Sequence, residues 1–170
     1  MKLIKYSIVA ALMLIASSVF AQDLKFGHID VQTLIMELPE KIAADQALQK
    51  QATDLQNQLK VMTEDLEKKY TEYLAQRETL DELIRATKEK EIQDTDQRIK
   101  NYNTLAQQNL QKKEQELLQP IIEKVQKAID AVGAETGLIY IFDTSSRVVV
   151  YHSDKSIDCA PLVKAKLAVK

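Results

Sequence analysis

The sequence predicts an α+β protein, mostly α, in which a long antiparallel helical hairpin, or tentacle, stands on a small β body. Residues 40–119 contain no glycine and no proline and are rich in Lys, Glu, Gln, Leu and Ala, the residues that favour helices. The spacing of their apolar residues changes half-way along, which favours two helices over one rod. Short β-branched segments occur only outside this run, at 24–31 and after 137.

The first 21 residues are expected to be a secretory signal peptide. Two lysines precede an apolar stretch at 8–15, and small residues follow, with Val19 and Ala21 at the positions that signal peptidase reads. We expect cleavage between Ala21 and Gln22 and export of the chain. A retained anchor is the alternative, although the apolar stretch is short for a bilayer.

The first half of the helical run has a heptad seam with one polar exception, Lys69. Its members are Leu48, Ala52, Leu55, Leu59, Met62, Leu66, Lys69 and Tyr73. The second half repeats every eleven residues, which suits a nearly straight pair of helices. Its two series are Ile99, Leu110, Ile121 and Val132, and Thr95, Ala106, Leu117 and Ala128.

The turn between the two helices is expected at residues 76–80, where Thr79 and Glu82 could form a capping box. A tip near Thr87 is the alternative. Pro39 suits the first turn of the first helix, and Pro120 predicts a kink in the second. Two glycines, at 133 and 137, are expected to end the hairpin arm, which then spans 39–133.

The body is expected to comprise residues 22–38 and 134–170. Residues 24–31 read as a strand, followed by a short helical turn at 32–38. The segments 138–142 and 148–151 read as buried strands joined in a hairpin, and Asp158 is placed to cap a last helix at 159–169 with Pro161 in its first turn. Because these apolar strands have no cover in their own chain, several copies are expected to share one sheet or barrel.

Composition excludes several classes of function. Removing the two lysines of the signal peptide leaves 21 basic and 25 acidic residues, a net charge of −4, with no basic stripe for nucleic acid. No spacing of cysteines and histidines predicts a metal site, and no nucleophile with a neighbouring base is visible. The single Cys159 is expected to be buried; an exposed thiol that cross-links two chains is the alternative.

Four motifs in order resemble the Skp/OmpH family of periplasmic chaperones. A signal peptide precedes a strand that runs into Ile-Asp-Val-Gln at 29–32, and a long hairpin opens with a proline. The segment Glu-Leu-Leu-Gln-Pro-Ile at 116–121, with Lys124, Val125, Ala128 and Ile129 after it, is similar to the family's return helix. Gly-Leu-Ile-Tyr-Ile-Phe-Asp at 137–143 is similar to its penultimate strand. The resemblance covers the whole mature chain.

The resemblance implies a periplasmic homotrimer whose three bodies build one β-barrel, with three hairpins around a central cavity. Its partners would be unfolded outer-membrane β-barrel proteins, held soluble without ATP, any cofactor or any catalytic residue. One departure matters, because residues 40–133 carry 15 basic and 18 acidic side chains whereas well-known members are strongly basic. A cationic cavity and a lipopolysaccharide-binding patch are therefore not carried over, and charge does not indicate membrane contact.

Aromatic and aliphatic residues on the arms are the candidate client-binding groups, because many weak apolar contacts suit a partner without a fixed shape. They are Tyr70, Tyr73, Leu74, Leu83, Ile84, Ile92, Ile99 and Tyr102. The expected core of the trimeric body is Phe26, Ile29, Leu138, Ile139, Ile141, Val149 and Tyr151.

Other interpretations stay open at this point. The arm tyrosines could instead fill the seam between the helices. His28 and His152 could meet in the body, where packed or surface histidines are favoured over a ligand-binding pair. A structural coiled-coil scaffold or spacer of the cell envelope is the alternative to a chaperone.

Overall fold

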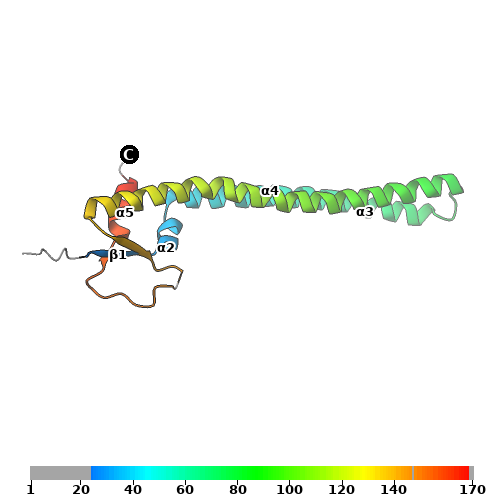
Figure 1. Ribbon diagram of the computed structural model, residues 1–170. Coiled ribbons are helices and arrows are strands. Elements are labelled where there is room, and N and C mark those ends of the chain that lie inside the picture. The colour runs from blue at the N-terminus through cyan, green and yellow to red at the C-terminus, as the bar shows by residue number, and fades with distance from the viewer. Residues whose placement is uncertain (1–23, 147, 169–170) are drawn as a thin grey trace, which may run out of the picture.

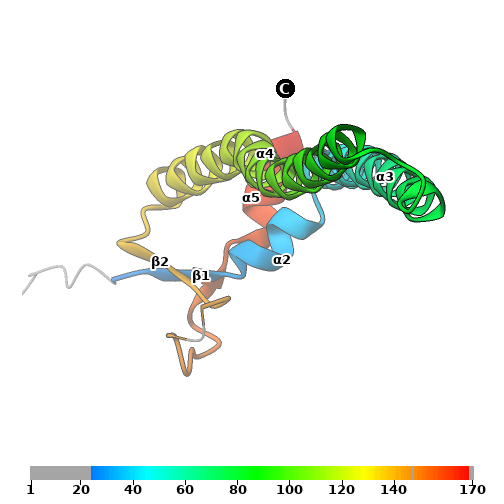
Figure 2. The same cartoon turned by 90° about the vertical axis from the view of Figure 1, so that its right-hand side faces the viewer.

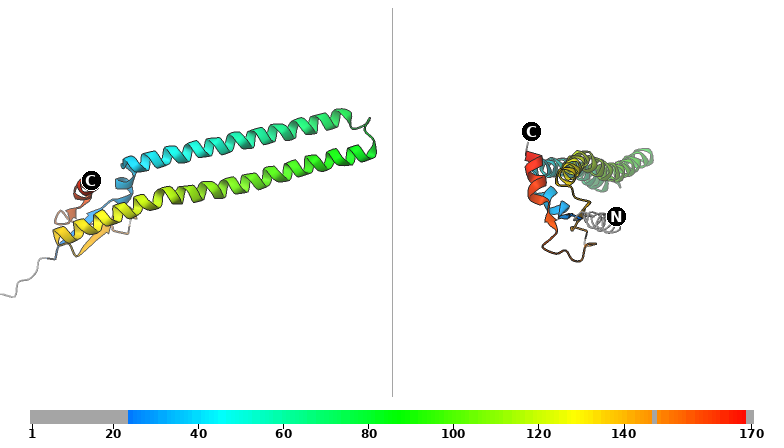
Figure 3. Two further views of the ribbon diagram at one scale, coloured as in Figure 1. Left: turned by 90° about the horizontal axis from the view of Figure 1, so that it is seen from above. Right: turned by 60° about the vertical axis from the view of Figure 1, so that its left-hand side comes forward.

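The computed structural model describes residues 24–146 and 148–168, and it has the predicted architecture of a long helical hairpin on a small body (Figure 1). The arms are helices α3 (Pro39–Gln76) and α4 (Glu82–Thr136). They run side by side and antiparallel from the body to a distant tip, and no other described element accompanies them (Figure 3). The predicted signal peptide and its cleavage site lie outside the described residues.

The seam between the arms follows the two predicted repeats. All eight residues of the heptad series in α3 and all eight of the eleven-residue series in α4 are buried or half-buried. Most other positions on both helices are exposed. The change of apolar period along the sequence thus marks two different helices, each with one narrow apolar stripe. The α4 stripe continues past the start of α3 into the body core, where Ile121, Ala128 and Val132 lie.

The tip confirms the predicted turn position but not the predicted cap. Residues 77–81 connect the arms, and Asp81 caps α4 by accepting a hydrogen bond from the Ile84 amide at 2.9 Å. Thr79, expected as the cap, instead donates from its hydroxyl to the Gln76 carbonyl at 2.8 Å and helps to close α3. The alternative tip near Thr87 is wrong, because Thr87 lies inside α4.

Helix α4 continues through Pro120 instead of being interrupted there. Pro120 is exposed, so water can satisfy the carbonyl that the missing amide leaves unpaired, and the next residues anchor the helix on the body. Gly133 lies within α4, contrary to prediction. The helix ends at Gly137, which has a left-handed φ of 67°, and the Leu138 amide bonds to the Gly133 carbonyl at 3.0 Å.

The body holds a three-stranded sheet in the order β2-β1-β3, formed by β1 (Phe26–Ile29), β2 (Tyr140–Asp143) and β3 (Ile157–Asp158). Both outer strands run parallel to β1. The whole hairpin therefore serves as the crossover between β1 and β2. Two short helices complete the body, α2 (Val31–Met36) and α5 (Ala160–Ala168), as Figure 2 shows.

The parallel sheet overturns the predicted β-hairpin of 138–142 with 148–151. Strand β2 pairs with the N-terminal β1, and residues 148–151 are not in a strand. The expectation that both segments are buried on two faces is also wrong within one chain, because Tyr140, Phe142 and Val150 are exposed. A run of β-branched residues sets a preference for extended backbone but does not select the partner strand.

The core lies where one face of the sheet meets the root of the hairpin. Side chains at intervals of three and four residues on α4 pack in one cluster with residues of α2, α5 and the sheet, which α4 contacts at β2. The fully buried side chains there include Ile29, Leu34, Val125, Cys159 and Val163. The prediction that Cys159 is a buried apolar residue is thus confirmed. Asp158 also caps as predicted, accepting from the Ala160 amide at 2.9 Å.

Candidate functional site

The described residues contain no group of three or more His, Cys, Asp or Glu side chains arranged to hold a metal ion. Among the helices that the structure describes, none has an apolar stretch long enough to cross a bilayer. The features that remain as candidates are apolar surfaces, one along the distal arms and one on the outer face of the sheet.

The distal arms expose large apolar side chains on both sides of the tip. Tyr70 and Leu74 on α3 and Leu83 and Ile84 on α4 are all exposed, with Leu83 at 77%. These four are among the predicted client-binding residues. Exposed apolar groups on an otherwise charged helix are available for contact with another molecule.

The remaining four predicted residues are less accessible. Ile92, Ile99 and Tyr102 are half-buried on α4. Tyr73 is only 6% exposed in the seam, where its hydroxyl donates to Glu89. This corrects its assignment as a surface contact and agrees with the alternative in which an arm tyrosine fills the seam.

A shallow groove of about 510 Å³ lies between the arms below the tip. Its apolar part is formed by Leu66, Tyr70 and Ile92, and Glu67 and Asp96 stand among its other lining residues. Leu66 is predicted from the sequence only as a seam residue, and the exposed Val61 and Leu105 are not among the predicted client-binding residues. Their signal was available in the sequence, because both are apolar residues that fall outside the repeats.

The distal half of the seam is polar. The Lys69 ammonium lies 3.0 Å from Asp65 and 3.2 Å from Glu91. The hydrogen bonds that Lys69 donates to these two carboxylates raise its pKa, and the hydrogen bond that the Tyr73 hydroxyl donates to Glu89 likewise raises the pKa of Tyr73. The pair of Lys69 with Asp65 lies within α3, whereas the contacts of Lys69 with Glu91 and of Tyr73 with Glu89 join the two arms and favour one register of α3 against α4.

The outer face of the sheet carries an aromatic cluster on β1 and β2. Phe26 stacks on Tyr140 with ring centroids 6.5 Å apart and on Phe142 at 6.3 Å, and the two β2 rings lie 5.8 Å apart. All three rings are exposed. The period of two along each strand explains this arrangement, because alternate residues Gly27, Ile29 and Ile141 face the core.

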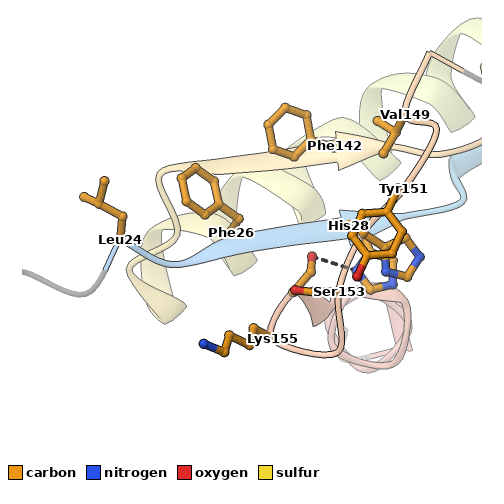
Figure 4. A pocket seen from close by; sticks show the side chains of 10 residues that line it. Leu24, Phe26, His28, Phe142, Val149, Tyr151, Ser153 and Lys155 are labelled. Carbon is orange, nitrogen blue, oxygen red and sulfur yellow. Dashed lines mark hydrogen bonds between the residues drawn. The ribbon is translucent and has the colours of Figure 1, made fainter.

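The predicted residues of the trimeric body divide in the same way. Ile29 is buried, Leu138, Ile141 and Val149 are half-buried, and Phe26, Ile139 and Tyr151 are exposed. A pocket of about 460 Å³ adjoins the aromatic cluster and is lined by Phe26, Phe142, Val149 and the two histidines, His28 and His152. Figure 4 shows Phe26, Phe142, Val149 and His28 around it. One chain thus leaves three of the seven predicted body-core residues exposed.

Comparison with known proteins decides the family. The family model for outer membrane proteins of the OmpH-like type matches residues 25–167. The chain belongs to the OmpH-like family. The resemblance inferred from the sequence motifs is therefore confirmed, and the match covers both the arms and the body.

A solved structure has the same fold as this OmpH-like chain. It is the crystal structure of an OmpH-like protein from Caulobacter crescentus CB15, assigned as an outer membrane chaperone. The two superpose with a TM-score of 0.75 over 85% of this chain and 83% of that chain, at 14% sequence identity. No curated protein matches the sequence.

Proposed function

We propose that this OmpH-like protein is an ATP-independent holdase chaperone that keeps unfolded outer-membrane proteins soluble between its helical arms. The observation that carries the proposal is the set of exposed apolar side chains near the tip, Tyr70, Leu74, Leu83 and Ile84. Dispersed apolar contacts fit a client without fixed structure, and holding a client requires no catalytic group. Family membership supports the same class of function.

We further propose that three copies assemble through their bodies and that the protein works in the periplasm after removal of residues 1–21. The support for assembly is the outer face of the sheet, where Phe26, Tyr140 and Phe142 are exposed together. An aromatic cluster of this kind on a small body gains stability when another copy covers it. Substituting Tyr140→Asp places a charge on this surface with little effect on the chain's own core.

The alternative of a coiled-coil scaffold is less well supported. A scaffold requires a continuous apolar seam and a polar exterior, whereas the seam here is polar around Lys69 and the exterior carries apolar residues. The near balance of charge on the arms offers no support for binding nucleic acid or an anionic membrane surface.

The test is suppression of aggregation when a urea-denatured outer-membrane barrel protein is diluted into buffer with the chaperone. We expect the unmutated protein to suppress light scattering and the triple variant Tyr70→Ser, Leu74→Ser and Leu83→Ser to lose most of this capacity. All three side chains are exposed, so the hairpin should fold, which circular dichroism checks.

The matched control removes an exposed ion pair from the same arm instead of apolar surface. Lys68→Ser with Glu72→Ser deletes a pair separated by 3.9 Å and should leave suppression unchanged, because exposed pairs contribute little. Full suppression by the apolar triple variant would refute the proposed client surface. Mass measurement by light scattering on the unmutated protein and on Tyr140→Asp tests the trimer, and a monomeric unmutated protein would contradict it.

A further inference from the structure

The only two histidines of the chain stack on each other in the body. His28 lies on β1 and His152 in the loop between β2 and β3, and their ring centroids are 3.8 Å apart with 21° between the ring planes. The Nδ1 atom of His28 also hydrogen-bonds with the Ser156 hydroxyl at 2.9 Å. Both histidines line the pocket on the outer face of the sheet, and Figure 4 shows His28 beside Tyr151 at one side of it.

The stacked pair connects the loop to the sheet. The same loop contains Val148, Val150 and Tyr151, which are 80%, 95% and 81% exposed and occupy no strand. Tyr151 and Val149 line the pocket together with Phe26 and both histidines. Contact between His152 and His28 therefore holds an exposed β-prone segment beside the aromatic cluster that we propose as the assembly surface.

The surroundings of the pair offer little compensation for added positive charge. Lys155 lines the same pocket, and none of the ten lining residues is acidic. On β3, Asp158 stands opposite His28 in the strand register and keeps its negative charge, but it does not line the pocket, and its carboxylate accepts a hydrogen bond from the Ala160 amide at the start of α5. Strand β2 presents the uncharged Phe142 at this position.

Two carboxylates on the flanking segments keep their charge, but the donors that hold them lie outside the pocket. Asp30 follows β1 and accepts bonds from the amide and hydroxyl of Thr33, where it caps α2. Asp143 ends β2 and accepts bonds from Ser145. Within the loop, Tyr151 and Asp154 are the further titratable neighbours, and both are exposed.

We propose that the His28–His152 stack is a pH-sensitive latch that holds the β2–β3 loop on the sheet when the rings are neutral and releases it when both are protonated. Histidine is the side chain whose ordinary titration falls between about pH 5 and 8. Two cationic rings at this separation repel, and even at the effective dielectric of a protein surface that repulsion exceeds a tenfold change in an equilibrium constant. Acidification therefore favours the open loop.

The consequence for assembly rests on the proposed trimer. If copies associate through the aromatic cluster and the loop beside it, release of the latch removes part of the associating surface from every copy. We expect the protomer concentration at half-assembly to rise at least about tenfold between about pH 7.5 and about pH 5. Three latches in one complex would make the increase larger.

Two measurements on protein without a histidine tag test the latch. The first follows the ring resonances of both histidines by NMR as pH is lowered. In the unmutated protein the protonation of one ring should depend on that of the other, because two cationic rings at this separation repel. In His152→Phe, which keeps an aromatic ring on His28 without a titrating group, this dependence should be absent and the His28 resonances should follow a different curve. An identical His28 curve in both proteins would overturn the latch.

The second measurement is mass against concentration at both pH values, by analytical ultracentrifugation. The unmutated protein and the matched control Lys155→Gln, which removes a pocket charge but keeps the pair, should both dissociate more readily at about pH 5. His152→Phe should assemble equally at both values. The same acid-induced dissociation in His152→Phe would overturn the regulatory role. A monomer at about pH 7.5 would instead refute the proposed trimer, while the ring titration would still decide the latch.

Discussion

Substitution of Gly27 by alanine should destabilise the protein through clashes in the core, the closest of them with Cys159. Gly27 lies at the centre of β1, and a Cβ atom added there would be 2.6 Å from the Sγ atom of Cys159 and 2.9 Å from Cδ1 of Leu138. Cβ atoms essentially never make contacts shorter than 3.0 Å, so the neighbours must move. Gly27→Ala is expected to lower the free energy of unfolding by about 1–3 kcal/mol, as overpacking of a core does.

The sulfur atom cannot move aside cheaply. Cys159 is 0% exposed, and its amide donates to the His28 carbonyl at 2.9 Å, which fixes its backbone against β1. Cys159→Ala alone removes a buried sulfur and should cost about 1 kcal/mol. In the double variant the new methyl group takes the space that the sulfur vacated. The double variant should therefore be more stable than the sum of the single costs implies, with a coupling of about 1 kcal/mol or more.

The assay is urea unfolding followed by circular dichroism at one fixed protomer concentration, because assembly would otherwise alter the apparent stability. Gly133→Ala is the matched control. Its added Cβ would lie 3.4 Å from the terminal Cδ1 of Ile141, which can rotate, and alanine favours the interior of α4. We expect it to be neutral or to stabilise by up to about 1 kcal/mol. Additive costs in the Gly27–Cys159 cycle would refute the reasoning.

Three further predictions concern acid stability, thiol reactivity and salt. Burial acts to raise the pKa of Asp143, but hydrogen bonds from the amide and hydroxyl of Ser145 and from the Val31 amide outweigh it and lower the pKa. The charged Asp143 therefore stabilises the fold fully above about pH 4, and this contribution is lost as pH falls through the lowered pKa. In urea unfolding, Asp143→Asn should be about 0.5–1.5 kcal/mol less stable at neutral pH and should lose less stability in acid than the unmutated protein. An equal loss of stability in acid for both proteins would argue against this role of Asp143. Burial, and to a lesser extent the charge of Asp158, raises the pKa of the Cys159 thiol, so a thiol reagent should modify Cys159 only as the protein unfolds. A modification rate in the folded protein like that of free cysteine would contradict the buried position of Cys159. Client capture should change little between about 50 and 300 mM salt because the arm charges nearly balance, and a collapse of capture over this range would show that electrostatics dominates.

The arms could be predicted from sequence because their structure depends on local spacing. The alternation from Leu48 to Tyr73 and the eleven-residue series in α4 identified which side chains lie in the seam, including the polar Lys69. The position of the turn could be predicted from the point at which the spacing of apolar residues changes. The cap was misplaced by two residues because Thr79 and Asp81 can both satisfy helix-end groups, and only the geometry of the turn selects between them.

The body could be predicted only in part because its contacts join the two ends of the chain. The pairing of Phe26 with Tyr140 spans the whole hairpin, so no local pattern indicated that β2 runs parallel to β1. The segment 148–151 has the composition of a strand, but composition does not show whether a partner exists in the same chain. The meeting of His28 and His152 was one of the arrangements that the sequence allowed, and the fold selects it.

We propose that the arms hold clients and that copies of the chain associate through their bodies. The most direct test of this proposal is a shortened protein in which residues 54–105 are replaced by a short glycine-containing turn. The deletion leaves the pairing of the remaining arm segments unchanged, because two contacts between the arms lie on its body side. Gln51 donates to Asn109, and closer to the body Lys124 pairs with Glu40. Loop-closure entropy depends only logarithmically on length, so the shortened hairpin should close and the body should remain intact.

The deciding measurement is the turbidity of a refolding outer-membrane protein with the shortened chaperone present. Light scattering on the shortened chaperone at the same concentration gives the mass of the chaperone assembly. We expect the shortened protein to form an assembly of three copies that melts cooperatively but no longer suppresses turbidity. Suppression equal to that of the full-length protein would place client binding on the body and contradict the account.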